Sequence, residues 1–323
     1  MSHDPQEAIF TICEEESNRR LDQVLATRWP KYSRAFFQKC ITDHRVLVNR
    51  VSSRPAYKVI EGMTVSLIWP EQKAETLSGE NIPLDILYED GDIIVINKPI
   101  GLVIHPANGN KTGTLVQALL YYKPEVFGNM IDEDQRPGIV HRLDKNTSGV
   151  LIIAKNKHSW EILKKTFKTH NLKKIYRGIV KGTPELSTGK IETDISRHPV
   201  NRLKRAVVPF GTGKTALTKY RIVDSNCHAS LLDIQIFTGR THQIRVHCSY
   251  MKHPILGDSL YGGAAGKEDF PAKRQLLHAW KLIIPHPITK EVMTFTAPLP
   301  EDMAEAAEFY GLNWHNLGDS NDE

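Results

Sequence analysis

From Pro83 onward, short apolar runs typical of β-strands recur at a spacing that suits hairpins. Two longer segments, 114–122 and 157–169, instead carry apolar residues at helical spacing. Since hairpins join antiparallel neighbours, the pattern predicts an α+β fold with a mixed, mostly antiparallel sheet and packed helices, and not repeated βαβ units. The predicted strands are 85–88, 93–97, 138–143, 149–155, 174–181, 217–223, 230–237, 276–284 and 291–296.

The residues before this region predict a separate small module. Apolar spacing predicts a helix over 19–29, and Ser33 is a suitable N-cap for a second helix. Two β-like runs follow at 45–49 and 63–68, and a polar, acidic stretch comes next. The expected organisation is a small domain over 17–70, a linker over 71–82, a second domain over 83–310 and an acidic C-terminal tail over 311–323.

Length and composition exclude several classes of protein. A chain of 323 residues is long enough for two domains with sizeable cores. Apolar runs such as 149–154 are too short to cross a membrane. The first 18 residues contain five acidic groups and no apolar stretch, which argues against a signal peptide. Four scattered cysteines without a CxxC pair favour a reducing cytoplasm and give no zinc pattern.

Charge is distributed unevenly along the chain. Residues 17–70 hold ten Lys or Arg against three acids, 140–181 hold eleven against two, and 197–219 hold six against none. Both ends are acidic, with five acids in 1–16 and seven in 301–323. A basic body with acidic ends favours a polyanionic partner such as nucleic acid, and a solvated basic surface is the alternative.

The densest polar cluster is His141-Arg142-Leu143-Asp144-Lys145-Asn146-Thr147-Ser148-Gly149, predicted to connect two strands. Asp144 is the only carboxylate between Asp134 and Glu161, and cations surround it. Those cations favour the ionised form, which can act as a nucleophile or stabilise an oxocarbenium-like centre. The residues alone leave open that Asp144 merely caps a turn.

Two further clusters carry chemistry-bearing residues. In 238–247, Arg240 is predicted to open a helix at a sheet edge, and the spacing of His242 and His247 does not match a zinc helix. In 173–180, strand alternation places Tyr176 among cations, where it could stack on an RNA base or be an ordinary core residue.

Several motifs, taken in order, resemble the RluA-type pseudouridine synthases. The segment 141–149 is similar to the signature of that family, and 239–247 and 253–262 are similar to its later motifs. The segments 94–99, 101–106 and 277–279 also fit. The N-terminal module resembles an S4 RNA-binding domain, notably at Arg20-Leu21-Asp22, Tyr32-Ser33-Arg34 and Val46-Leu47-Val48-Asn49. It departs from the S4 pattern where glycines are usual, at His44 and Arg50.

The resemblance implies an isomerase that converts uridine in RNA to pseudouridine without cofactor or metal. It implies that Asp144 is the catalytic carboxylate, that Arg240 pairs with it, and that Tyr176 stacks under the target base. It also implies substrate contacts from a wider set of cations, with Arg142 entering the RNA stack as the uridine leaves. That set is Arg142, His141, Lys98 and Arg245.

For the N-terminal module the resemblance implies RNA contacts from Arg19, Arg20, Arg34 and Arg45. In the S4-bearing branch of the family the substrate is large-subunit (23S) ribosomal RNA, free or in a precursor particle. We therefore expect a cytoplasmic monomer that binds ribosomal RNA and no membrane. Two alternatives stay open at this point, namely the same chemistry on transfer RNA or other ribosomal sites, and a non-catalytic RNA-binding or ribosome-assembly protein.

Overall fold

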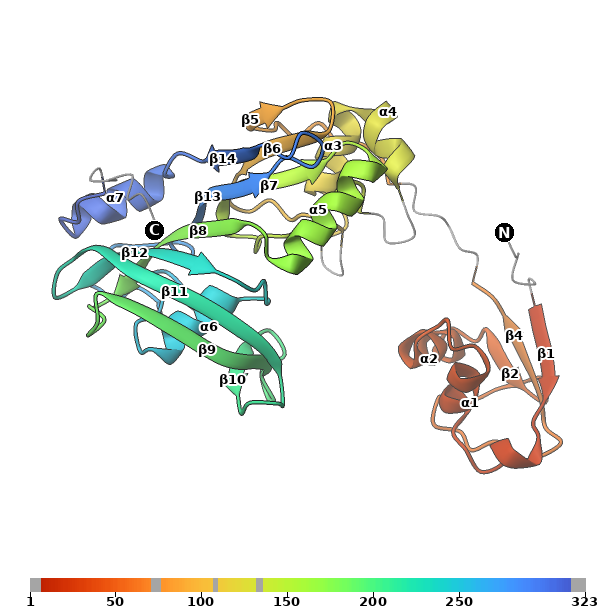
Figure 1. Cartoon of the computed structure of the whole chain (residues 1–323). Helices are drawn as coiled ribbons and strands as arrows, with labels where there is room; N and C mark the ends of the chain where they lie inside the picture. Colours follow the sequence, from red (N-terminus) through yellow and green to blue (C-terminus); the bar gives the residue numbers. More distant parts are fainter. Residues whose placement is uncertain (1–6, 71–76, 107–109, 132–135, 315–323) are drawn as a thin grey trace. The chain divides into compact units, whose positions relative to one another are not determined.

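The computed structural model describes residues 7–70, 77–106, 110–131 and 136–314. The chain forms two compact units, Met1–Thr76 and Leu77–Glu323, called unit 1 and unit 2 below (Figure 1). No helix among the described residues is both long and apolar enough to cross a membrane.

Unit 1 packs two helices against a small antiparallel sheet of strand order β1-β4-β2-β3. Ser33 caps α2 as predicted, because its side chain accepts the Phe36 N–H. The sheet includes β1, which lies ahead of the boundary expected at residue 17. The elements are β1 (Glu7–Thr11), η1 (Glu14–Glu16), α1 (Leu21–Arg28), α2 (Arg34–Thr42), β2 (Val46–Val48), β3 (Val51–Ser52) and β4 (Thr64–Ile68).

Left-handed backbone occurs in unit 1 where the S4 pattern usually has glycine. His44 has φ 58° and Arg50 has φ 67°, and Asn49, which precedes Arg50 in the β2–β3 turn, has φ 48°. Positive φ at both central residues gives the twist that a tight hairpin needs. The turn is therefore kept without glycine, at the expense of backbone strain at a residue that carries a Cβ.

Unit 2 is built on one ten-stranded sheet of order β10-β9-β11-β12-β8-β13-β7-β6-β5, with β14 paired to β13. The β13–β7 pair is parallel and every other described pair is antiparallel, so the mixed, mostly antiparallel sheet is confirmed. Its strands are β5 (Ile86–Glu89), β6 (Ile93–Lys98), β7 (Ser148–Ala154), β8 (Lys173–Lys181), β9 (Thr188–Arg197), β10 (Arg205–Val208), β11 (Lys214–Ser225), β12 (Ala229–Ile236), β13 (Leu277–Pro285) and β14 (Val292–Thr296).

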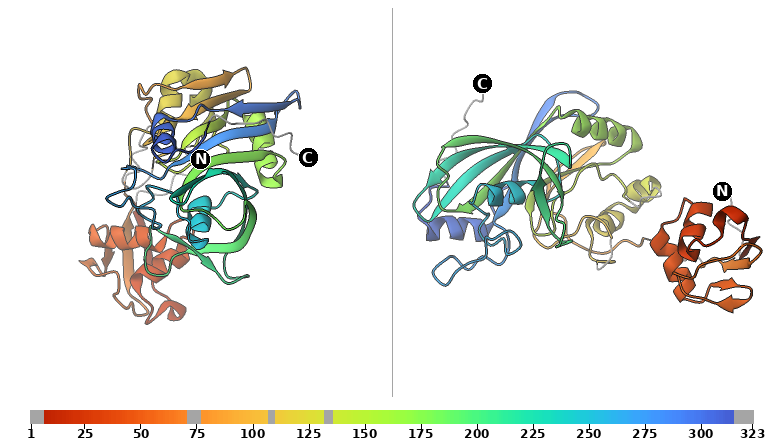
Figure 2. Two further views of the ribbon diagram at one scale, coloured as in Figure 1. Left: turned by 90° about the vertical axis from the view of Figure 1, so that its left-hand side faces the viewer. Right: turned by 90° about the horizontal axis from the view of Figure 1, so that it is seen from below.

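Strand alternation assigns the helices of unit 2 to opposite faces of the sheet. Side chains such as Ile94 and Tyr176 pack with α3 and α6, whereas Ile93 packs with α5 and Ile179 with α7. In the left view of Figure 2, α6 lies inside the curve of the sheet. The helices are α3 (Leu115–Tyr122), α4 (Pro124–Phe127), η2 (Gly128–Met130), α5 (Lys157–Thr169), α6 (Gln243–Tyr250) and α7 (Glu301–Phe309).

The strand predicted over 138–143 is wrong. This segment runs beside β7, but it makes one isolated bridge, Ile139 to Ile153, instead of a ladder. The His141 ring takes the place of a strand partner, because its Nε2 accepts the Ile152 N–H at 3.1 Å. The motif that contains Asp144 therefore enters β7 from an irregular segment.

Two stretches at the expected domain boundaries pack onto unit 2. Leu77 and Ile82, in the expected linker, contact the core, and the Glu80 N–H donates to the Gln117 carbonyl. Leu312, in the expected tail, is buried beside α7. The remainder of the expected linker and tail, 71–76 and 315–323, lies outside the described residues.

Candidate active site

Asp144 stands at the start of a tight turn that leads into β7. The Thr147 N–H donates to the Asp144 carbonyl at 3.0 Å and closes the turn. The next two carbonyls are also fixed, since Lys98 Nζ donates to Lys145 O at 3.1 Å and Arg274 Nη1 donates to Asn146 O at 3.2 Å. Because three consecutive carbonyls have partners, the turn holds the Asp144 backbone in one position.

The Ser-Gly pair after the turn allows a close approach of two strands. Gly149 has φ +113°, and a Cβ there would lie 2.2 Å from the Ala279 carbonyl oxygen, so only glycine fits. Ser148 Oγ lies 2.9 Å from His278 Nδ1 on the parallel neighbour β13. The glycine therefore lets β7 lie against β13 directly beneath the site.

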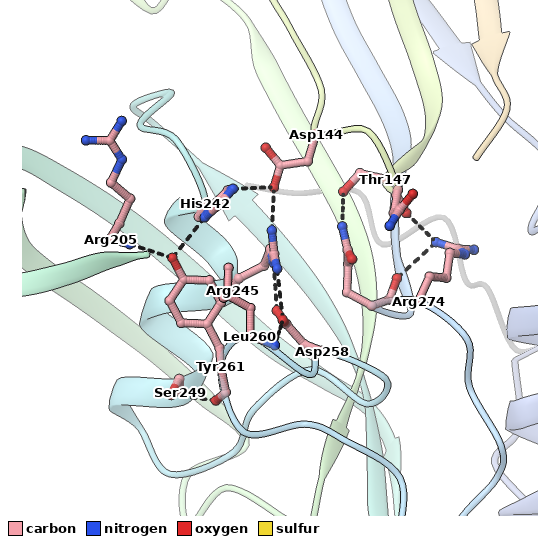
Figure 3. A network of polar contacts seen from close by, with 12 residues as sticks. Asp144, Thr147, Arg205, His242, Arg245, Ser249, Asp258, Leu260, Tyr261 and Arg274 are labelled. Atoms are coloured by element: carbon pink, nitrogen blue, oxygen red, sulfur yellow. Dashed lines mark hydrogen bonds and ion pairs between the residues drawn. The ribbon is translucent and has the colours of Figure 1, made fainter. Parts of the chain in front are cut away.

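The carboxylate of Asp144 is paired with Arg245 of α6. Arg245 Nη1 lies 3.1 Å from Asp144 Oδ2, while its Nε and Nη2 bond both oxygens of buried Asp258, at 2.6 and 2.8 Å (Figure 3). The expected pairing with Arg240 is wrong, because Arg240 Nε donates to the Thr215 carbonyl at 2.9 Å. The bidentate bond to Asp258 fixes the plane of the guanidinium and thus the position of its third contact.

Asp144 opens onto a pocket that is lined by all three predicted catalytic residues. Tyr176 of β8 and Arg240 both line it, and exposed Arg142 stands at its edge. Burial raises the pKa of Tyr176 well above its usual value, and the nearby charge of Asp144 adds to the effect. Tyr176 is therefore a neutral phenol in an apolar wall. The lining consists of Arg142, Leu143, Asp144, Thr147, Tyr176, Ile236, Gly239, Arg240, Thr241, His242, Gln243, Ile244, Arg245 and Leu277.

Lys98, expected to contact substrate, lies beneath the catalytic turn and has no exposed surface. Its Nζ donates to the carbonyls of Pro99, Leu102 and Lys145 at 2.7, 3.0 and 3.1 Å. An ammonium group has three N–H donors, and all three are used, so Nζ has none left for the expected substrate contact. Burial, with a contribution from the charge of Arg274, lowers the pKa of Lys98 to about 7.

His141, which was also expected to bind substrate, is likewise a structural group. Its ring stacks on Phe167 of α5 with centroids 4.5 Å apart, and its Nε2 accepts the Ile152 N–H. Burial, with Lys174 nearby, lowers the pKa of His141 to about 3, so the ring is neutral at neutral pH. The structure thus uses His141 to support β7 and not to face the pocket.

Sequence reasoning gave no role to His242, Asp258, Tyr261 or Arg274, although all four belong to the network around the turn (Figure 3). One signal was available for Asp258. Arg245 stands between apolar residues on a helix, and a buried arginine needs a carboxylate partner. The Gly-Asp pair that follows the helix supplies it.

The described residues contain one cluster of metal-ligand type, Asp90, Asp92 and His286, whose ligand atoms lie within 4.8 Å of one another. His286 Nδ1 accepts the N–H groups of Ile288 and Thr289, so its proton is on Nε2 and is donated to Asp90 Oδ2 at 2.9 Å. These hydrogen bonds account for the arrangement of the three side chains without a metal ion.

Comparison with known proteins agrees with this geometry. Residues 92–250, which include Asp144, Tyr176 and Arg245, match the family model described as RNA pseudouridylate synthase. The chain belongs to this family and is an RNA pseudouridine synthase, an isomerase.

Curated relatives match nearly the whole chain. It is 40% identical over 302 residues to the ribosomal large subunit pseudouridine synthase D of Haemophilus influenzae, covering 90% of this chain and 91% of the relative. It is 40% identical over 309 residues to the protein of that name from Escherichia coli strain K12, covering 92% of each.

Two solved human structures share the fold. RNA pseudouridylate synthase domain containing 4 is 25% identical with a TM-score of 0.57, over 71% of this chain and 94% of that one. RNA pseudouridylate synthase domain containing 1 is 29% identical with a TM-score of 0.54, over 68% of this chain and 85% of that one.

Proposed function

We propose that this enzyme isomerises uridines of large-subunit ribosomal RNA and that Asp144 is its catalytic carboxylate. The curated relatives that match it over nine-tenths of its length are named for that ribosomal subunit. The observation that carries the catalytic assignment is a carboxylate on a fixed turn, ion-paired to a buried arginine and facing a pocket with a buried tyrosine.

The reaction needs a group that acts at the sugar or the base. The N1–C1′ bond breaks, the uracil rotates, and a C5–C1′ bond forms, while C5 loses a proton and N1 gains one. An ionised carboxylate can attack C1′, add to the base, or remove a sugar proton. Arg245 orients Asp144 for each of these roles, because it bonds only Oδ2 and leaves Oδ1 available to the substrate.

The pocket walls suit a flipped uracil. Tyr176 is 8% exposed and packs in the same core cluster as Ile236 and Leu277, so a neutral ring faces the pocket between aliphatic side chains. A flat apolar wall of this kind can stack on a base. Extruding a base costs a few kcal/mol, and exposed Arg142 at the pocket edge is placed to fill the gap left in the RNA.

We propose that unit 1 is an S4-like RNA-binding domain. Asp22, whose side chain has no exposed surface, accepts two bonds from Arg20 at 3.1 and 3.0 Å and one each from Arg34 at 3.0 Å and Gln38 at 2.7 Å. The two arginines keep 39% and 45% of their side chains exposed. Guanidinium groups fixed in this way have lost their rotamer freedom before they meet a phosphate.

We also propose that Arg19 and Arg45 contact RNA. Arg19 is exposed and is oriented by a bond from Nη2 to Thr27 Oγ1 at 3.0 Å. Arg45 is half-buried just before β2. Together with Arg20 and Arg34 they would add phosphate contacts and make RNA binding depend on salt.

We also propose that the enzyme works as a monomer in the cytoplasm. All four cysteines are free thiols, two exposed and two buried, which suits a reducing compartment. Light scattering of the purified chain tests the oligomeric state.

The proposed substrate is tested by mapping pseudouridines in cells that lack this protein. Carbodiimide treatment and primer extension should show large-subunit sites that disappear with the gene, return with the natural chain, and stay absent with Asp144→Asn. Sites lost only from transfer RNA would overturn the proposed substrate. Sites restored by Asp144→Asn would overturn the catalytic assignment.

A further inference from the structure

His242 immediately precedes α6 and has a left-handed backbone, with φ 59°. Residues with a Cβ adopt this conformation uncommonly, and Gly or Asn adopt it more readily. A side chain at this position often caps the helix, yet that of His242 makes no capping bond. The strained conformation therefore serves to place the imidazole elsewhere.

The imidazole is oriented by Tyr261. His242 Nδ1 lies 2.9 Å from the Tyr261 hydroxyl, whose oxygen accepts the Arg205 backbone N–H at 2.7 Å (Figure 3). A phenol has one hydrogen to donate, and a backbone N–H cannot accept it. No other described residue accepts the Tyr261 hydrogen, so we assign it to Nδ1, and the neutral ring then carries its own proton on Nε2.

That Nε2–H faces Asp144. Nε2 lies 3.8 Å from Oδ2, the oxygen that also accepts from Arg245 Nη1 at 3.1 Å. Oδ1 makes no hydrogen bond with any described residue, although Asp144 lines the pocket. The Arg245 and His242 N–H groups therefore both lie on the side of Oδ2, and Oδ1 is left for the substrate. Burial lowers the pKa of His242, partly offset by the charge of Asp144, which agrees with a neutral ring.

We propose that His242 is a positioning residue for the isomerisation. Tyr261 holds its ring so that Nε2–H faces Oδ2 of Asp144, beyond hydrogen-bond length at 3.8 Å. With RNA bound, Nε2–H would close onto Oδ2 beside Arg245 and keep Oδ1 pointed at the reacting uridine. This inference rests on the proposed catalytic role of Asp144. His242 would restrain the Asp144 carboxylate in addition to the ion pair with Arg245. A single bond from Nη1 leaves the carboxylate free to rotate about its Cβ–Cγ bond.

Two substitutions separate the ring nitrogens. An Asn amide reaches only as far as Nδ1, whereas a Gln amide reaches Nε2, and Asn suits the left-handed backbone. His242→Asn should lower the single-turnover rate at saturating RNA by about 10- to 100-fold, since misplacement of a catalytic group by about 1 Å has effects of that size. RNA affinity should stay near that of the natural enzyme, and His242→Gln should recover most of the rate.

Tyr261→Phe supplies the independent test. It removes the hydroxyl but keeps the ring, which lies 5.0 Å from the Arg245 guanidinium and edge-on to His242. The rate should fall, and the double variant with His242→Asn should be no slower than His242→Asn alone, because the hydroxyl acts through the imidazole.

A natural rate in His242→Asn, or additive losses in the double variant, would overturn the positioning role. Loss of RNA affinity with a natural saturating rate would make His242 a substrate contact and would also overturn it. Asp144→Asn is assayed in parallel. If that variant turns over, the proposed function fails, whereas an inactive Asp144→Asn beside a fully active His242→Asn refutes only this inference.

Discussion

In unit 1 a fully buried carboxylate, that of Asp22, holds two arginines that remain at the surface. In unit 2 the arrangement is reversed, because buried Lys98, Arg245 and Arg274 hold a turn whose carboxylate keeps 20% of its side chain exposed. In each cluster, the charged group that reaches solvent indicates what the cluster does. Fixed cations suit a phosphate backbone, and a fixed carboxylate suits chemistry on a neutral uridine.

The largest expected effect is at Asp144, the partly exposed carboxylate of unit 2. Asp144→Asn keeps the shape but cannot act as nucleophile or base, so turnover should fall by at least about 10⁴-fold. RNA affinity should stay within about tenfold, since the change adds no phosphate repulsion. Release of the C5 proton as tritium measures the rate, and filter binding measures affinity. Turnover near the natural rate would remove Asp144 from the central role.

The next effect compares two arginines of the same motif. Arg245→Lys keeps the charge but cannot bond Asp144 and Asp258 together, so we expect a loss of about 100-fold in the saturating rate. Arg240→Ala should lose less, because Arg240 bonds the Thr215 carbonyl and not the carboxylate. Rates measured side by side decide the order. A larger loss for Arg240→Ala would restore the pairing that the sequence suggested.

As the pH is lowered, the free energy of unfolding of unit 2 should fall before that of unit 1. Burial lowers the pKa of His141 to about 3 and those of His247 and His278 to about 4. The unfolded chain binds protons below about pH 6.5 that these folded rings reject. The free energy of unfolding of unit 2 should thus fall with pH from about 6.5 to 4, by up to about 1.4 kcal/mol per pH unit for each histidine.

The shifted groups of unit 1 act at lower pH. A hydrogen bond from Arg28 lowers the pKa of Glu16 to about 2, and bonds from Arg20, Gln38 and Arg34 outweigh burial and lower that of Asp22. Their contribution is complete above about pH 4.5 and is lost as pH falls through the folded values. Between pH 7 and pH 5.5, calorimetry should show a lower unfolding temperature for unit 2 and an unchanged one for unit 1. An equal shift of both unfolding transitions would contradict this difference.

The smallest expected effect concerns the β2–β3 turn of unit 1. Arg50→Gly relieves a left-handed residue at φ 67° and should raise the free energy of unfolding of unit 1 by up to about 1 kcal/mol. Arg50→Ala is the matched control, since it removes the same charge but keeps the Cβ. Equal stability of the two variants in urea unfolding would mean that charge, and not backbone strain, sets the difference.

Local signals predicted most elements, and packing decided the rest. The helix predicted over 157–169 matches α5 at both ends, because Asn156 caps it and its apolar face is regular. The segment 138–143 is as apolar as a strand, but a histidine ring replaces its ladder partner. Strands β9 and β10 were not predicted. The exposed positions of β9 are polar or charged and its apolar pattern is weak, and β10 is a four-residue strand with no alternation of burial.

The sequence predicted which residues form the site better than it predicted which of them bond to one another. Asp144 and Tyr176 come together as expected, because the signature turn and the β8 alternation are local patterns. Whether Arg240 or Arg245 meets Asp144 depends on how α6 packs inside the sheet, which spacing does not encode. The burial of Lys98 is likewise a tertiary property, since its motif is a strand end that could equally face solvent.

The division of labour between the units is tested most directly by a truncated chain that begins at Leu77. That start keeps Leu77 and Ile82 in the core of unit 2, which has its own complete sheet. RNA affinity against salt and the single-turnover rate at saturating RNA are measured for both chains. We expect a rate within about threefold of the full chain, weaker affinity, and a shallower salt slope from fewer phosphate contacts. Equal affinities with equal slopes, or a lost rate at saturation, would contradict the account.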